Sequence, residues 1–274
     1  MGLGSFCTKK DGQLITLQPK SLNITGIQKG FVQCLEITQS IQSEEDLNEV
    51  SYILPTDNNL CIYRMKFQVG DEIIEAQLRS QKVADETFKE AKKIGKTVAK
   101  TEYVSPGLTS IKIGNVPKNK PVSIIFQCSF ISTLQSPTKI LTKIPLQASD
   151  PDGSLVDLYT IPSLEINLDL AISQMETITD VYANCESTYE KTDDKNGKFT
   201  IKSAIITDEN ILIITELSSP LQSQMVQSGT SSVISLIPEF NSKQSTAKEF
   251  VFLVDCSASM LGESIRKAKS SLNL

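Results

Sequence analysis

Apolar and polar residues alternate over much of the first 135 positions, which is the period of a β-strand with one buried face. Every second residue is apolar from 122 to 130, and the same alternation runs from 61 to 69. The run from 31 to 41 is less regular, because Gln33 and Gln39 interrupt the apolar positions. We expect these three runs to be half-buried strands, with residues 61, 63, 65, 67 and 69 sharing one face.

Turn signals separate the strand patterns. Val69-Gly70-Asp71-Glu72 predicts a hairpin turn, since glycine adopts positive φ readily. Gly114-Asn115-Val116-Pro117 predicts a second turn that proline closes. Short strands joined by such turns indicate an antiparallel β architecture.

One segment has the period of a helix instead. Between Val83 and Ile94 the apolar residues recur every three or four positions, and Gly95 follows as a helix cap. Gly95-Lys96-Thr97 is similar to the end of a phosphate-binding loop, but the position that requires glycine upstream is Glu90, and a helix precedes it instead of a strand. These departures argue against nucleotide binding.

Strand patterns return in the second half of the chain, after a loop signal at residues 148–153. Asp150, Asp152, Ser154 and Asp157 could suggest a calcium loop, but the glycine and the closing glutamate of an EF-hand are misplaced, so a solvated turn is favoured. Further strands are expected at 164–170, 177–185, 198–206, 210–216 and 232–237.

Composition and charge limit the function. The chain has 274 residues, enough for two domains, and a net charge of −5 with no basic block that could neutralise a run of phosphates. We therefore expect no nucleic-acid partner. No run of eighteen apolar residues and no signal peptide is present, which predicts a cytoplasmic protein without a membrane span.

The residue types argue against catalysis. The chain has no histidine, which removes the commonest general base and metal ligand. Its six cysteines are far apart, and buried free thiols are the favoured interpretation. No residue is a candidate catalyst, so we expect a protein that is not an enzyme.

The last thirty residues have the order strand, acidic loop, helix. An apolar run ends at Val254, the loop Asp255-Cys256-Ser257-Ala258-Ser259 follows, and helical spacing begins at Ile265. A run that is apolar on both faces is typical of a central parallel strand, whose carboxyl end is where such sheets bind ligands. The small polar residues could also serve only to cap the helix.

The loop resembles the first part of the metal-ion-dependent adhesion site of von Willebrand A domains. The resemblance implies Asp255, Ser257 and Ser259 as partial ligands of Mg²⁺ or Mn²⁺, which prefer hard oxygen donors. Ala258 stands where the family usually has glycine. The family completes the site with a threonine and an aspartate from later loops, so this chain alone should bind metal weakly.

The preceding region resembles the VIT domain, named from vault protein and inter-alpha-trypsin inhibitor. The resemblance rests on Tyr52-Ile53-Leu54-Pro55, Gly70-Asp71-Glu72-Ile73, the helix end at Gly95-Lys96 and Gly114-Asn115-Val116-Pro117. Gly12–Leu17 and Asn184–Glu186 are most similar to the intracellular von Willebrand factor A domain-containing protein 5 group.

The resemblance implies a mainly β protein in three parts. These are a VIT β-sandwich with one helix at 1–135, a β-rich segment at 136–245, and the first strand and helix of an A domain at 246–274, so the chain is expected to be a fragment. The implied function is protein–protein recognition, cation-dependent only where the A domain is complete. Two alternatives stay open, a piece of a vault-type poly(ADP-ribose) polymerase and a piece of a secreted inter-alpha-trypsin heavy-chain-like protein.

Overall fold

The structure is a computed structural model that forms two compact units, residues 1–221 and 222–274. It describes residues 4–10, 13–55, 60–76, 80–105, 108–146, 164–206, 210–229, 231–237 and 251–272. The loop at 148–153 and the acidic positions up to Asp157 lie outside this part, so the interpretation of that loop stays a prediction.

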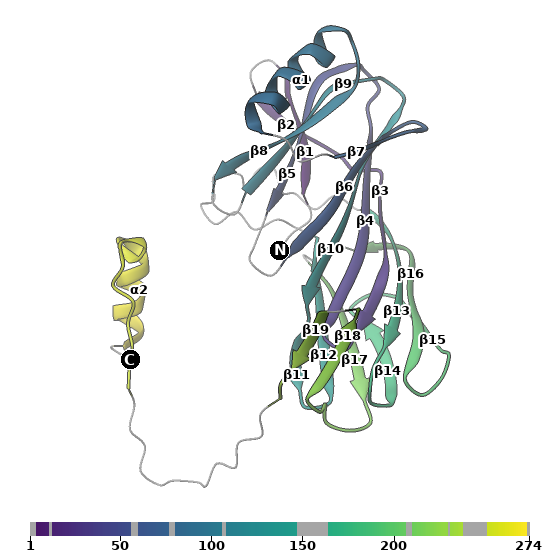
Figure 1. Cartoon of the computed structure of the whole chain (residues 1–274), viewed down its shortest axis with the longest axis vertical. Coiled ribbons are helices and arrows are strands. Elements are labelled where there is room, and N and C mark those ends of the chain that lie inside the picture. The colour runs from purple at the N-terminus through teal and green to yellow at the C-terminus, as the bar shows by residue number, and fades with distance from the viewer. Residues whose placement is uncertain are drawn as a thin grey trace. The chain divides into compact units, whose positions relative to one another are not determined.

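Three β-sheets and one helix build the first unit (Figure 1). Sheet A has the strand order β2 (Gln13–Leu17), β1 (Ser5–Lys10), β5 (Leu47–Pro55), β9 (Leu108–Val116) and β8 (Val98–Ser105). Sheet B has the order β15 (Thr188–Lys191), β16 (Asn196–Ile206), β13 (Leu164–Ser173), β3 (Ser21–Lys29), β4 (Val32–Gln42), β10 (Pro121–Ile131), β6 (Cys61–Val69) and β7 (Glu72–Glu75). Sheet C has the order β11 (Thr133–Ser136), β12 (Lys139–Pro145), β17 (Asn210–Leu217) and β14 (Ile178–Ala183). The prediction of a mainly β fold is confirmed.

Sheet B joins the two halves of this unit. Its strand β13 pairs in parallel with β3, from Ile166 opposite Leu22 to Ser173 opposite Lys29. Strands from both sides of residue 135 therefore share one sheet. The predicted domain boundaries at 135 and 245 stay predictions, but the segments on either side of residue 135 are hydrogen-bonded neighbours along eight residue pairs.

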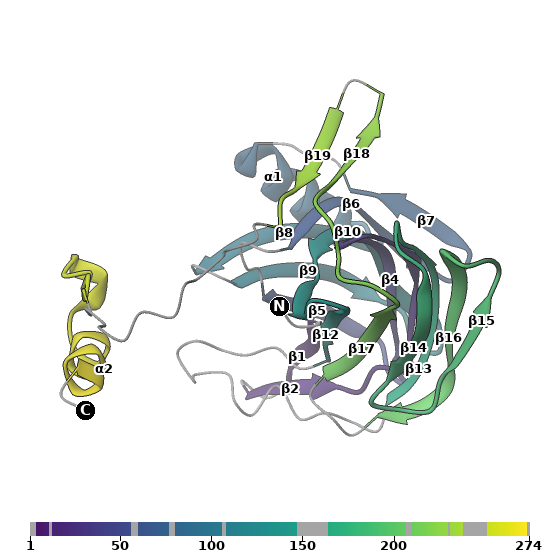
Figure 2. The same cartoon turned by 90° about the horizontal axis from the view of Figure 1, so that it is seen from below.

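One face of β4 contacts both of the smaller sheets. Alternate β4 residues are buried, and they include the two glutamines that interrupt the apolar pattern. Gln39 accepts a hydrogen bond of 2.9 Å from the hydroxyl of Tyr52 in sheet A. Gln33 donates one of 3.1 Å to the hydroxyl of Thr142 in sheet C. The two glutamines thus lie near opposite ends of one strand, and each faces a different smaller sheet. Figure 2, seen from below, shows sheet C beside β13 and β16.

Most strand predictions are confirmed. The inward residues of β10 are at most 7% exposed, as are those of β13 between Ile166 and Leu170. The expected strands near 177–185, 198–206, 210–216 and 232–237 are present as β14, β16, β17 and β19. β19 (Ser231–Ser235) forms a hairpin with β18 (Gln224–Ser228) in the second unit.

The helix prediction is confirmed as α1 (Gln81–Lys93), which ends at Gly95 with φ of +76°. Phe88 is its one buried residue, at 5% exposure, while Ile94 is 70% exposed. None of the helices in the described ranges is long and apolar enough to cross a membrane.

Two details of the strand predictions are wrong. In β6 the register shifts between Gln127 and Cys128 of the neighbouring strand, so Cys128 pairs with Ile62, and Tyr63 is 58% exposed instead of buried. A bulge of this kind adds one residue and reverses the alternation on one side of it. Gly114, Asn115 and Val116 belong to β9, and the turn follows at Pro117–Lys120.

The prediction that the cysteines are free thiols is confirmed, but the prediction that they are buried is partly wrong. All six thiols are free, and Cys7 and Cys128 are buried. Burial raises the pKa of Cys7 to about 11 and that of Cys128 to about 12, so both stay protonated at neutral pH. Cys61 and Cys256 are exposed.

The predicted strand before Asp255 is absent from the described residues 251–254. Val251, Phe252 and Leu253 are 86%, 67% and 100% exposed, and no strand of the described chain pairs with them. A parallel strand depends on neighbours for its hydrogen bonds and its burial, which explains why the apolar pattern alone does not produce one here. The helix that follows is confirmed as α2 (Glu263–Leu272), after the 3₁₀ turn η2 (Ala258–Met260).

The contact between sheets A and B depends on one fully buried hydroxyl. The Tyr52 hydroxyl donates to Gln39 and accepts the Gly4 N–H at 3.0 Å, and burial raises its pKa. We expect Tyr52→Phe to lower the free energy of unfolding by about 1–3 kcal/mol, because it leaves both partners buried and unpaired. Urea denaturation measures this, with Tyr63→Phe on the exposed face as the matched control. A loss equal to that of the control would contradict the structural role of the hydroxyl.

Candidate functional sites

Two of the predicted metal ligands, Asp255 and Ser257, lie in an exposed loop. The Asp255 carboxylate accepts the Ser257 N–H at 2.8 Å and the Ser257 hydroxyl at 3.1 Å. Both hydrogen bonds favour the charged carboxylate and hold the pKa of Asp255 below its ordinary value. The Ser257 side chain makes no cap hydrogen bond to η2, so it serves Asp255 and not the helical turn. The loop therefore brings one carboxylate and one hydroxyl together.

These groups do not complete a metal site. Mg²⁺ requires about six oxygen ligands in octahedral geometry. The loop supplies one carboxylate, and the described part of the chain contains no group of three or more His, Cys, Asp or Glu residues placed to hold a metal. The backbone of Ser259 lies in η2, of which Ser257 is the N-cap residue. The arrangement is a partial donor set, and no cation chemistry follows from it alone.

A cleft of about 480 Å³ lies in the first unit, between sheet A and α1. Two strands and a turn form most of its wall, and α1 and β9 each add one lysine. The lining residues are Thr8, Lys9, Lys10, Glu45, Asp46, Leu47, Asn48, Glu49, Ser51, Lys92 and Lys112. The cleft begins where β1 leaves β5, because their pairing ends at Thr8 opposite Val50.

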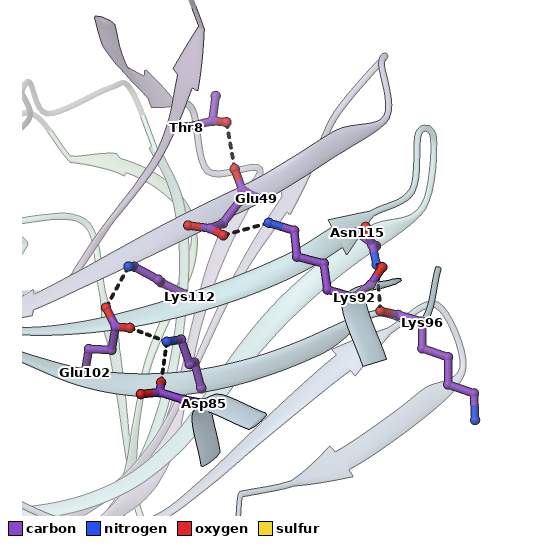
Figure 3. Close-up of polar contacts among 9 residues, drawn as sticks. Thr8, Glu49, Asp85, Lys92, Lys96, Glu102, Lys112 and Asn115 are labelled. Atoms are coloured by element: carbon purple, nitrogen blue, oxygen red, sulfur yellow. Dashed lines mark hydrogen bonds and ion pairs between the residues drawn. The ribbon is translucent and has the colours of Figure 1, made fainter. Parts of the chain in front are cut away.

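Ion pairs fix α1 to sheet A along this cleft (Figure 3). Lys92 of α1 contacts Glu49 of β5 at 2.8 Å. Lys100 of β8 contacts Asp85 of α1 at 2.7 Å and also pairs with Glu102, its neighbour on the same strand. Partly buried pairs of this kind are screened less by salt than exposed ones. They hold the helix over the sheet at two separate points.

An aromatic ring lies between these two points. The ammonium groups of Lys92 and Lys100 are 5.9 and 5.1 Å from the centre of the Phe88 ring, within the range of a cation–π contact. Gly114 of β9 lies beneath the ring, and a Cβ atom there would come within 3.3 Å of both Phe88 and Lys92. The glycine therefore permits the close approach of helix and strand.

Asn115 closes the C-terminal end of α1. Its φ of +54° turns the side chain so that Nδ2 donates to the carbonyls of Lys92 and Lys96 at 2.8 and 3.0 Å. The Thr97 hydroxyl donates to the Asn115 carbonyl at 2.8 Å. The Lys92 carbonyl also accepts the Gly95 N–H at 3.2 Å, so Asn115 adds a second bond there and fixes the position of this helix end against β9.

Sequence reasoning missed the cleft and its ion pairs. The charged residues come from five separate elements and a turn, and each one alone has the pattern of a solvated face. The one available signal was Gly114-Asn115, which the sequence analysis assigned to a turn although the pair supports the helix.

The second ion pair of Glu102 gives a pH-dependent contribution to stability. Lys112 contacts Glu102 at 2.7 Å. Partial burial raises the pKa of Glu102, but hydrogen bonds from Lys100 and Lys112 outweigh it, and the net effect lowers the pKa. Stability from this group is therefore present above its ordinary pKa and lost as the pH falls through the lowered value.

We expect Glu102→Gln to lower the free energy of unfolding by about 1 kcal/mol at neutral pH, with the difference from wild type narrowing as the pH falls below about 4. Urea denaturation at a series of pH values measures it, and Glu44→Gln on the exposed turn is the control. A difference that stays constant with pH would show that Glu102 acts through packing instead of charge.

Residues 19–128 match the family "Vault protein inter-alpha-trypsin domain". Among curated proteins, two von Willebrand factor A domain-containing proteins of Dictyostelium discoideum are similar to the chain. One is 27% identical over 81% of this chain and 27% of its own length, and the other is 26% identical over 74% and 23%. The chain thus spans about a quarter of the length of these relatives.

Among solved structures, an M1 zinc metallopeptidase from Deinococcus radiodurans shows a weak likeness, with a TM-score of 0.41, 10% identity, and coverage of 80% of this chain and 46% of that one.

The family match lies inside the predicted VIT segment and includes β3 to β7, α1, β8, β9 and most of β10. The names of the relatives support the von Willebrand A part of the predicted architecture. The assignment to the von Willebrand factor A domain-containing protein 5 group stays a prediction. The VIT match and the von Willebrand A domain-containing relatives suggest a protein-interaction domain. The VIT match over residues 19–128 and the von Willebrand A names of the relatives together support a VIT plus von Willebrand A architecture.

Proposed function

We propose that this chain is the VIT-containing part of a cytoplasmic, non-enzymatic protein that recognises other proteins. The observation that carries the proposal is the order of a VIT domain and an Asp-x-Ser-x-Ser loop, in relatives that carry von Willebrand A domains. In this proposal the VIT-containing unit and the A domain have different roles. The first unit presents a rigid β surface, and the A domain would supply a cation-dependent contact.

The geometry of the loop supports the second part. Asp255 is exposed and its pKa is lowered, so its carboxylate is charged and accessible at neutral pH. In a complete A domain, further oxygen ligands from later loops would join Asp255, Ser257 and Ser259 around Mg²⁺ or Mn²⁺. A divalent cation with an open position would then accept a carboxylate of the partner protein. Within this chain the Asp255 and Ser257 groups are too few for tight binding.

Calorimetry with MgCl₂ tests the proposal that the 274-residue chain alone binds metal weakly. We expect the 274-residue chain to bind Mg²⁺ no more tightly than about 1 mM, because one carboxylate and one or two hydroxyls are a small share of the octahedral ligand set. Micromolar affinity that Asp255→Ala removes would show that the loop forms a complete site on its own.

Affinity capture with a longer protein that includes a complete von Willebrand A domain tests protein recognition itself. We expect captured partners to be lost on addition of EDTA and in Asp255→Ala, and to be retained in Asp71→Ala, a matched change in the exposed β6–β7 turn. Partners that survive both EDTA and Asp255→Ala would contradict cation dependence but leave protein recognition in place. Capture of no partner under any condition would argue against the function as a whole.

A further inference from the structure

Charge is distributed unevenly along this chain. Residues 89–120 contain eight lysines and two acidic residues, although the whole chain has a net charge of −5. This stretch covers the second half of α1, both strands β8 and β9, and the turn after β9. A positive segment in an acidic protein creates a local potential that differs in sign from that of the rest of the chain.

Folding brings the two ends of this stretch together. Asn115 donates to the carbonyls of Lys92 and Lys96, so the end of β9 lies against the end of α1. Lys118 and Lys120 follow Asn115 by three and five residues, and both are exposed. In Figure 3 the Lys96 side chain extends away from the ion pairs.

Seven of the eight lysines divide into two groups by their surroundings, and Lys89 is exposed on α1. Lys92, Lys100 and Lys112 pair with carboxylates of sheet A and α1, and their side chains are 12–32% exposed. The second group is exposed at the end of α1 and in the turn after β9. It consists of Lys93, Lys96, Lys118 and Lys120, and we call it the basic rim.

Acidic residues near the rim have partners already. Glu45 contacts Lys10 at 2.8 Å, and Asp46 accepts the Lys118 N–H at 2.8 Å. Both residues line the cleft. The excess positive charge of the rim is therefore next to a cleft in which Glu45 and Glu49 pair with lysines and Asp46 keeps its negative charge. Ile94 adds an apolar side chain that is 70% exposed.

We infer that the basic rim and the adjoining cleft bind an acidic, extended segment of a partner protein. The inference rests on the proposed function and deepens it, because it assigns protein recognition to a surface of the VIT domain. Carboxylates of the segment would meet the lysines of the rim, an apolar residue would cover Ile94, and the polar cleft would accept main-chain groups. Complementary charge of this kind raises the rate and the selectivity of association.

The mixed charge of the cleft favours a peptide over a nucleic acid. A nucleic acid presents a continuous run of phosphates, and Glu45, Asp46 and Glu49 line the cleft where that run would pass. A peptide spaces its carboxylates and places neutral groups between them, so it can contact the rim and avoid the acidic wall.

Fluorescence anisotropy with a labelled peptide of four Glu-Leu-Ser repeats tests the inference on the whole 274-residue chain. We expect saturable binding that weakens at high salt, and a loss of at least about tenfold in the charge reversal Lys93→Glu with Lys96→Glu. The matched control is Lys195→Glu with Lys202→Glu, two exposed lysines at β16, which should leave the affinity within about twofold. Melting curves establish that both variants fold.

Three outcomes would overturn the inference. They are no saturable binding by the wild type, an equal loss in the control variant, and tighter binding to a single-stranded RNA of similar charge than to the peptide. Affinity capture with the full-length protein separates this inference from the proposed function. Partners that depend on Asp255 but not on the rim would leave the function standing and remove only the role of this surface.

Discussion

The fold depends on β4, because one buried face of this strand contacts two sheets. Gln39 reaches Tyr52 in sheet A, and Gln33 reaches Thr142 in sheet C. An inward polar side chain is costly when it has no partner, so each glutamine specifies what must lie opposite to it. Apolar side chains between them, such as Leu35 and Ile37, supply burial without such a requirement. The strand therefore combines a general hydrophobic contribution with two specific contacts.

The same strand explains why the VIT region and the following segment form one compact unit. β4 pairs with β3, and β3 pairs in parallel with β13, which comes about 140 residues later in the chain. Sheet C then covers the end of sheet B that sheet A leaves open. A family boundary and a structural unit need not coincide, because the family match ends at residue 128 while the shared sheet continues to Ile206. The cleft and the basic rim lie at the other end, where α1 covers sheet A.

Patterns confined to one strand or helix predicted that element correctly. The alternation in β10 and the helical spacing before Gly95 each depend on neighbours within one element, and both predictions are confirmed. The bulge at Tyr63 depends on register against another strand, and the parallel pairing of β13 depends on a segment far away in the sequence. By the apolar pattern alone, Gln33 and Gln39 are interruptions, since a pattern of single residues contains no information about the opposite sheet. Their hydrogen bonds show that they belong to the buried face.

The two candidate sites differ for the same reason. Asp255 and Ser257 are two residues apart, so their hydrogen bond follows from the loop itself, and sequence reasoning could name them. Their function needs ligands from other elements, which a short motif cannot supply. The basic rim has the opposite character, because its lysines come from two elements that Asn115 holds together. A surface that folding assembles in this way keeps its shape without a cation, so the proposed recognition by the VIT domain does not require the proposed metal site.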